Sequence, residues 1–167
     1  HVHGLVGGHS GSEIDKGRAN ANILLGRLLF ELHEALPFCI ISVDGGDKDN
    51  AIPVDSKAEI VVSDEDIDEI QSLAAAFQEK VRSEFHVCGP VIAIDADVRA
   101  EGGYEVFSMA LTEKVIFMLM QVPNGIQTMS ADLPGLVESS LNLGVLETTE
   151  EGVAMTWAIR SSVKSLK

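Results

Sequence analysis

A glycine-rich segment near the start of the chain, Gly4-Leu5-Val6-Gly7-Gly8-His9-Ser10-Gly11, constrains the fold most strongly. Four glycines around one histidine and one serine leave little side-chain bulk, so the backbone can turn sharply there. His9 can then project from the end of a strand and donate a hydrogen bond from its imidazole. The pattern is equally typical of an ordinary strand-to-helix loop in which His9 only lies near the surface. Both interpretations stay open at this point.

Two classes of nucleotide site are excluded by the spacing of these glycines. The segment matches neither G-x-G-x-x-G nor G-x-x-x-x-G-K-[ST], and no lysine follows at the required place. We therefore do not expect a phosphate-binding loop.

The charge balance excludes a further class of partner. The 167 residues include 12 basic and 26 acidic side chains, which gives a formal net charge of −14. A surface this acidic repels a phosphate backbone, so nucleic acid is not an expected partner.

No apolar run approaches the roughly 18 residues of a membrane span, and the sequence begins without a signal-peptide pattern. We expect a cytoplasmic protein without a membrane partner.

The two cysteines do not indicate a disulfide framework. Cys39 and Cys88 are too few and too far apart in sequence for a disulfide scaffold or a cysteine-based zinc site. Each lies beside an apolar strand pattern, which predicts buried free thiols.

The first half of the chain predicts a ferredoxin-like order of elements. Residues 2–8 alternate weakly as a strand, and leucines with helical spacing follow until Pro37 ends the helix. A hairpin of two strands, 38–43 and 57–62, comes next, followed by a helix over 64–81 and a strand over 91–98. The order β-α-β-β-α-β places both helices on one face of an antiparallel sheet, because such crossovers are right-handed. We assign residues 1–98 to this half of an α+β domain.

Residues 99–167 predict a second, incomplete half that extends the sheet. An almost entirely apolar helix covers 109–122, and strands cover 143–149 and 153–161 around the turn at Glu150 and Glu151. A second helix is missing, and residues 163–167 resemble its first turn. We therefore expect the chain to be part of a longer protein.

Four stretches of motif residues, taken in order, cover nearly the whole chain. They are Gly7-Gly8-His9-Ser10-Gly11 with Gly17-Arg18-Ala19-Asn20-Ala21; Gly45-Gly46 with Asn50-Ala51-Ile52-Pro53; Met129-Ser130-Ala131-Asp132 with Gly135-Leu136-Val137-Glu138-Ser139-Ser140-Leu141-Asn142-Leu143-Gly144; and Ala158-Ile159-Arg160-Ser161-Ser162. Together these stretches resemble one family, the bacterial aminoacyl-histidine dipeptidases, which form the carnosinase-like branch of the two-zinc metallopeptidases. The third stretch is the most specific of the four.

The resemblance is to the lid, or dimerisation, domain of these enzymes, which is inserted into a separate catalytic domain that holds the zinc. The family's zinc ligands include a His-x-Asp pair and a Glu-Glu pair, and this chain has no His-x-Asp. Glu150 and Glu151 are better explained as a solvated turn. His1 and His3 share one strand face, but the sequence shows no third ligand near them. We expect no metal and no cofactor in this chain, with zinc in the absent catalytic domain.

The resemblance also assigns roles to four residues. His9 is the lid residue that reaches the tetrahedral oxyanion, and Arg160 binds the substrate's C-terminal carboxylate. Asn50 and Asn142 match polar lid positions that hydrogen-bond the substrate backbone, each expected just before a strand. For Arg160 a surface salt bridge, and for each asparagine a purely local turn role, remain open alternatives.

The implied function is that of a lid that closes over a dipeptide such as beta-alanyl-histidine, is inactive alone, and forms a homodimer. Two other functions fit the sequence. One is an autonomous ferredoxin-like module that pairs with another copy or binds a small ligand, and the other is a purely structural dimerisation domain.

Overall fold

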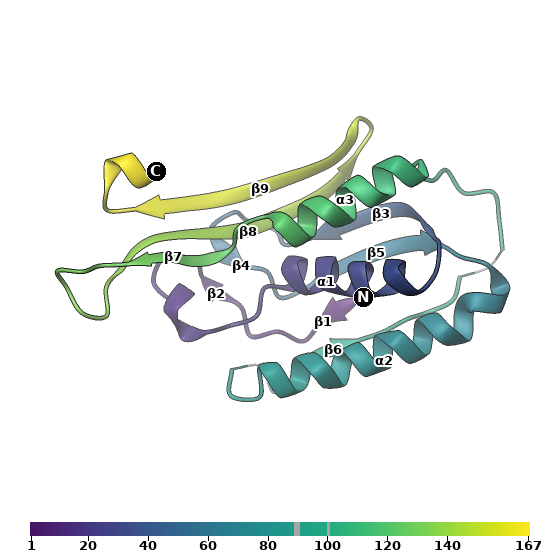
Figure 1. The fold of residues 1–167 in the computed structure, drawn as a ribbon, viewed down its shortest axis with the longest axis horizontal. Helices are drawn as coiled ribbons and strands as arrows, with labels where there is room; N and C mark the ends of the chain where they lie inside the picture. The colour runs from purple at the N-terminus through teal and green to yellow at the C-terminus, as the bar shows by residue number, and fades with distance from the viewer. Residues whose placement is uncertain (89–90, 100) are drawn as a thin grey trace.

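The fold was analysed in a computed structural model that describes residues 1–88, 91–99 and 101–167. It is a mixed α+β structure with helices on a largely antiparallel sheet (Figure 1). In chain order the elements are β1 (Val2–His3), β2 (Gly8–His9), α1 (Ala21–Ala35), β3 (Cys39–Gly45), β4 (Ala51–Ile52), β5 (Ser56–Val61), α2 (Ile67–Glu84), β6 (Ala93–Ile94), α3 (Met109–Gln121), β7 (Gly125–Met129), β8 (Val137–Thr149) and β9 (Gly152–Ser161).

The main sheet has the order β6-β1-β5-β3-β8-β7. Strand β9 also pairs with β8, on the side of β8 opposite β7. The strand pairs recorded in it are antiparallel. The four strands β6-β1-β5-β3 have the order of a ferredoxin-like sheet, and β8, β7 and β9 extend that sheet. The predicted fold class is confirmed. A division near residue 98 stays a prediction, since β3 and β8 belong to one continuous sheet.

The helices α1, α2 and α3 lie across the same face of the sheet (Figure 1). Asn20 caps α1, because its side-chain oxygen accepts the backbone N–H groups of Asn22 (3.0 Å) and Ile23 (3.2 Å). Arg27 on α1 joins Glu84 on α2 through two hydrogen bonds of 2.7 and 2.8 Å. The core between helices and sheet includes Val2, Leu24, Leu25, Leu28, Leu29, Leu32, Ile40, Val43, Phe77, Val81, Ile94, Ile116, Leu119, Leu143 and Leu146.

The N-terminal strand differs from the sequence prediction. Only Val2–His3 joins the main sheet, whereas Gly8–His9 forms a separate two-stranded sheet with β4. The chain turns between the two strands at Gly7, whose φ of +66° lies in the region that favours glycine. The single strand predicted over 2–8 was therefore wrong, and the turn moves His9 off the main sheet.

The C-terminal half contains more strand than predicted. β7 was not predicted, and β8 begins at Val137, so the predicted strand 143–149 is only its second half. Residues 137–142 are largely polar, but pairing with both β7 and β9 satisfies their backbone groups. The predicted apolar helix is α3, which buries one face containing Ile116 and Leu119 and leaves Phe117 exposed.

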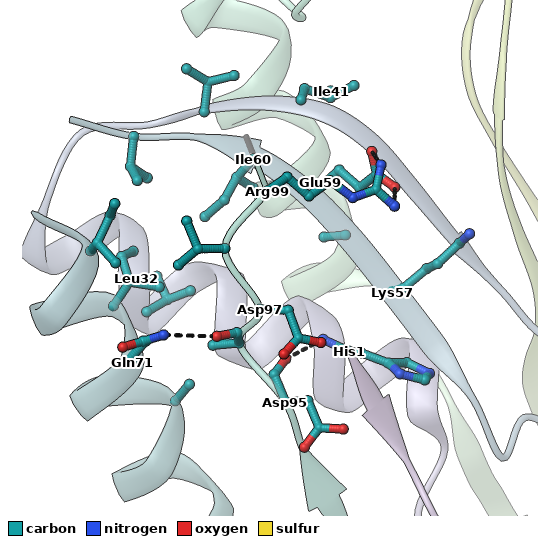
Figure 2. Close-up of a pocket in the computed structure, with 18 of the residues that line it drawn as sticks. His1, Leu32, Ile41, Lys57, Glu59, Ile60, Gln71, Asp95, Asp97 and Arg99 are labelled. Atoms are coloured by element: carbon teal, nitrogen blue, oxygen red, sulfur yellow. Dashed lines mark hydrogen bonds and ion pairs between the residues drawn. The ribbon is translucent and has the colours of Figure 1, made fainter. Parts of the chain in front are cut away.

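A groove of about 840 Å³ lies between α1, α2, β5 and the segment after β6. Figure 2 shows Leu32 and Gln71 beside it, with Lys57, Glu59 and Arg99 around its charged side. None of the four predicted site residues lines this groove.

In the described residues, no helix is both long and apolar enough to cross a membrane. Cys39 and Cys88 are free thiols, as predicted, but both are partly exposed, so the prediction that they are buried was wrong.

Candidate functional site

The small β2–β4 sheet brings His9 beside Asn50. His9 pairs with Ala51 in antiparallel register, and the Ser10 backbone N–H donates to the carbonyl oxygen of Asn50 at 2.9 Å. Asn50 is exposed in the turn that precedes β4, as the sequence predicted. Two segments 40 residues apart in the sequence are thereby fixed side by side.

Local hydrogen bonds determine the proton position on His9. Its Nδ1 accepts the backbone N–H groups of Gly11 at 3.1 Å and Ser12 at 3.2 Å. An accepting Nδ1 assigns the proton of the neutral ring to Nε2. Among the described residues Nε2 has no hydrogen-bond partner, and the His9 side chain is exposed. The histidine therefore presents a free N–H donor to solvent.

The backbone of this loop is held by Glu13 and Arg18. Glu13 accepts the His9 backbone N–H at 2.9 Å and pairs with Arg18 at 2.8 Å. Arg18 also donates to the carbonyl oxygen of Gly7. The backbone hydrogen bond from His9, followed by the hydrogen bond from Arg18, lowers the pKa of the Glu13 carboxyl. This clamp fixes the chain on both sides of Gly8.

Arg160 approaches the same loop from β9. Arg160 pairs with Ser140 of β8, which places it near the end of the outer strand. A Cβ on Gly11 would lie 2.9 Å from Cζ of Arg160 and 2.9 Å from Cε1 of His9. Only glycine fits at this position without displacing one of the two side chains. Residues separated by most of the chain thus meet over Gly11.

Arg160 differs from the other arginines, because no carboxylate among the described residues pairs with it. Arg18, Arg27, Arg82 and Arg99 each form an ion pair with a glutamate. Within the described residues Arg160 forms none, and its Nε is buried without a hydrogen-bond partner. In a chain of net charge −14 an arginine finds a carboxylate easily. The structure therefore does not support the alternative of a surface salt bridge for Arg160.

Asn142 lies beneath the site. Its Nδ2 donates to the carbonyl oxygens of Asp49 and Ala51, both at 2.8 Å, and its Oδ1 accepts from Asn20 at 3.2 Å. The residue is 1% exposed and lies within β8, so the expectation that it precedes a strand was wrong. The strand begins earlier because residues 137–141 pair with β7. The two donated bonds bracket Asn50 and hold its turn against β8.

Sequence reasoning missed the side chains that assemble this site. Besides capping α1, Asn20 donates to Asn124 and to the Leu143 carbonyl oxygen, and the sequence did not indicate these contacts. Glu13 and Ser10 were not singled out either, although the hydroxyl of Ser10 is buried without a partner. The sequence contains the asparagines of this network, at the start of α1 and directly after Pro123 and Leu141, but their contacts are seen only in the fold.

The arrangement supplies hydrogen-bond donors rather than a nucleophile or a base. Where the β2–β4 loop meets β9, His9 Nε2–H and the Arg160 guanidinium are two donors without a partner among the described residues. Such a pair suits an anionic ligand that has two separated oxygen centres.

Comparisons with known proteins relate this chain to dipeptidases and to a dimerisation domain of peptidases. A family model described as a peptidase dimerisation domain matches residues 1–87. The cytosol non-specific dipeptidase of Escherichia coli (strain K12) is 36% identical over 164 residues, which cover 98% of this chain and 34% of that protein. The crystal structure of aminoacylhistidine dipeptidase from Vibrio alginolyticus superposes with a TM-score of 0.93 at 34% identity, over 98% of this chain and 33% of that chain.

This chain therefore spans about a third of the length of each dipeptidase that it matches. The matches confirm the resemblance found in the sequence, both to the dipeptidases and to their dimerisation domain. The chain belongs to the peptidase dimerisation domain family.

Proposed function

We propose that this chain is the lid of a dipeptidase and that it supplies His9 and Arg160 to the bound substrate. The observation that carries the proposal is the meeting of these two side chains over Gly11, each with an unused donor. The relatives support the reaction class, since one is named a non-specific dipeptidase and the other an aminoacylhistidine dipeptidase. We also propose that this dipeptidase acts in the cytoplasm on dipeptides that end in histidine, such as beta-alanyl-histidine.

In this proposal His9 stabilises the oxyanion that forms when the peptide carbonyl is attacked. Its Nε2–H is the free donor, and the bonds from Gly11 and Ser12 to Nδ1 fix both tautomer and ring orientation. A donor already oriented before the reaction needs no reorganisation as negative charge develops on the oxygen. Closing the lid would also exclude water from the site.

Arg160 binds the C-terminal carboxylate of the dipeptide in the same proposal. A guanidinium can donate two parallel hydrogen bonds to a carboxylate, and this one has no competing partner in the described residues. His9 and Arg160 would then contact two different groups of one small substrate, the reacting carbonyl and the terminal carboxylate.

Asn50 and Asn142 have different parts in the proposal. Asn50 is exposed beside His9 and is available to the substrate backbone. Asn142 is buried, and its amide hydrogens are donated to Asp49 and Ala51. We therefore assign Asn142 to positioning the Asn50 turn in this conformation.

The zinc of the proposed parent enzyme does not fit this chain. A two-metal site needs carboxylates that bridge or flank both ions, and the described residues contain one candidate ligand cluster, His1, His3 and Asp95, with a single carboxylate in it. We place the zinc in the rest of the protein and assign only substrate contacts to the residues described above. The isolated chain is accordingly expected to hydrolyse no dipeptide.

We also propose that the chain forms a homodimer. The strand β9 (Gly152–Ser161) lies at the outer edge of the sheet, where it pairs with β8 alone among the described strands (Figure 1). A second copy can satisfy its outward N–H and C=O groups. The net charge of −14 opposes association, so added salt should strengthen the dimer. A monomer at high protein concentration and high salt would contradict this.

Replacing His9 in the full-length dipeptidase tests the catalytic role. Loss of an oxyanion donor should lower kcat about 10²–10³-fold in His9→Ala. His86→Ala is the matched control, since His86 is exposed and bonds only to the Ser83 carbonyl oxygen in the described structure. Unchanged kcat in His9→Ala would favour a purely structural dimerisation domain or an autonomous binding module.

A further inference from the structure

The first strand carries a second group of polar side chains that the proposed function does not use. In the register of β1 and β6, Val2 pairs with Ile94 and His3 with Ala93, so His1 faces Asp95. The backbone agrees, because the N–H of Asp95 donates to the His1 carbonyl oxygen at 2.9 Å. Alternate residues of a strand share a face. His1, His3 and Asp95 therefore project together from the face opposite the buried Val2 and Ile94.

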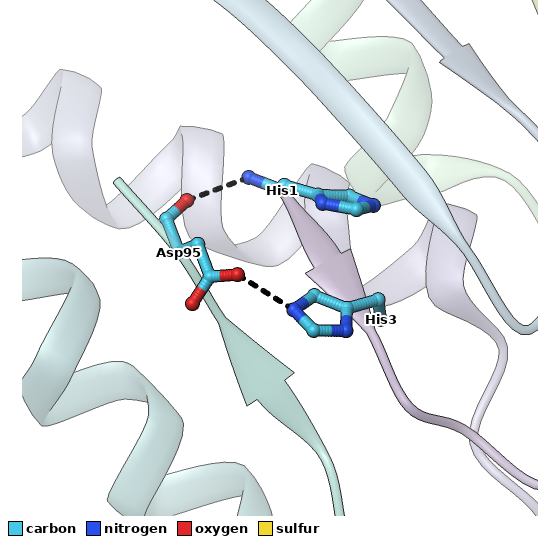
Figure 3. Close-up of side chains that lie close together, drawn as sticks. All are labelled: His1, His3 and Asp95. Atoms are coloured by element: carbon cyan, nitrogen blue, oxygen red, sulfur yellow. Dashed lines mark hydrogen bonds and ion pairs between the residues drawn. The ribbon is translucent and has the colours of Figure 1, made fainter. Parts of the chain in front are cut away.

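The three side chains are close together (Figure 3). His3 Nε2 lies 2.7 Å from Oδ2 of Asp95, and the His1 and His3 rings stack with centroids 4.6 Å apart. One ligand atom from each residue lies within 4.8 Å of the others. In a tetrahedral zinc site neighbouring ligand atoms are about 3.4 Å apart, so side-chain rotations that move atoms by about 1 Å would close the set.

We propose that His1, His3 and Asp95 bind one zinc ion. Two imidazoles and a carboxylate are a donor set that zinc accepts, and three protein ligands leave a fourth position for water or another ligand. The expectation that the chain binds no metal rested on the lack of a third ligand near His1 and His3. Folding supplies that ligand from 92 residues further along the chain.

The surroundings favour a cation here. Asp55, which immediately precedes β5, contacts Nε2 of His1 with its Oδ2 at 2.5 Å, so a second carboxylate adjoins the cluster. A carboxylate in this position can orient the imidazole or take the fourth coordination position. The net charge of −14 raises the local concentration of divalent cations at the surface.

The proposed ion would cross-link two short strands at one edge of the sheet. β1 and β6 are each two residues long, and β6 forms the edge. A metal bound across them cross-links strands that few backbone hydrogen bonds join. Zinc should therefore stabilise the folded chain, because it binds the native strand pair and not the separated strands.

The test uses the untagged chain, extended before His1 so that no free α-amino group adjoins the cluster. Calorimetric titration with Zn²⁺ should give one ion per chain, and Co²⁺ should give the absorption of a tetrahedral site. Asp95→Asn and His3→Ala should each weaken Zn²⁺ binding at least about tenfold, whereas the control His86→Ala should not. Zn²⁺ should raise the Tm of the unmutated chain and of the control only.

Circular dichroism verifies that the variants fold, and folding is expected because all three side chains are partly exposed. Wild-type affinity in both Asp95→Asn and His3→Ala would overturn the proposal. So would half-saturation of the unmutated chain only above about 1 mM, which corresponds to a weak surface contact.

Discussion

The imidazole of His9 and the guanidinium of Arg160 meet over the α-carbon of Gly11, although 151 positions separate the two residues in the sequence. Strand β9 carries Arg160 to this point, and the short β2–β4 sheet carries His9. Neither side chain donates to another described side chain. The contact is therefore a junction of two free donors, and each part of it can be tested.

Gly11→Ala tests the junction itself. The added Cβ would lie 2.9 Å from each of the two side chains and must displace one of them. We expect kcat/KM of the full-length dipeptidase to fall about tenfold or more, because small misplacements of catalytic groups are costly. Gly103→Ala is the control, since a Cβ there meets nothing within 4 Å. Equal activities for the two variants would show that the junction has no functional part.

The Glu13 clamp predicts a dependence of stability on pH. The pKa of Glu13 is lowered from its usual 4.5 by the His9 backbone N–H and by Arg18. A group with a lowered pKa in the folded state contributes stability above the unfolded pKa and loses that contribution as the pH falls through the folded pKa. Glu13→Gln should therefore lower the free energy of unfolding at pH 7. The difference in this free energy between the variant and the unmutated chain should become smaller as the pH falls below about 4.5.

Urea unfolding from pH 7 to pH 3 measures this difference. Glu150→Gln in the exposed β8–β9 turn is the control and should differ little from the unmutated chain at any pH. If the free energies of unfolding of Glu13→Gln and the unmutated chain differed by the same amount from pH 7 to pH 3, ionisation of Glu13 would not be the cause of its stabilising effect.

Asn142→Ala tests the positioning role proposed for this side chain. It removes the donors to the Asp49 and Ala51 carbonyl oxygens and the acceptor for Asn20. Leaving buried polar groups unpaired should lower the free energy of unfolding by about 1–3 kcal/mol. Asn50→Ala, in the exposed turn, should change it by less than about 0.5 kcal/mol. Similar losses in both variants by urea unfolding would argue against separate roles for the two asparagines.

Much of the fold could be predicted from the sequence, because the spacing of apolar residues within a segment indicates whether that segment is a helix or a strand. The leucines of α1 define one buried face, and Pro37 and Pro123 each follow the end of a helix. β7 and the first half of β8 could not be predicted in this way. Residues 137–142 have a polar pattern typical of a loop, and they form a strand only because β7 and β9 pair with them on both sides.

For the site, the resemblance suggested four residues but could not show how they contact one another. It could not indicate that Asn142 is buried or that Arg160 has no carboxylate partner in the described part of the chain, because both depend on contacts between distant segments. The Asp95 partner of His3 was missed for the same reason. Local pattern suggests which side chains are candidates, and tertiary packing decides which of them keep free donors.

The proposed binding of the substrate's terminal carboxylate by Arg160 is tested by measuring kcat/KM for a dipeptide and for its C-terminal amide. Charge-assisted bonds worth about 1.5–3 kcal/mol should make Arg160→Ala about 10- to 100-fold slower on the dipeptide. Arg160→Lys should recover only part of this loss, because an ammonium cannot form the planar pair of bonds. The mutant should barely distinguish the dipeptide from the amide. An Arg160→Ala enzyme that discriminates the two as well as the unmutated enzyme would contradict the account.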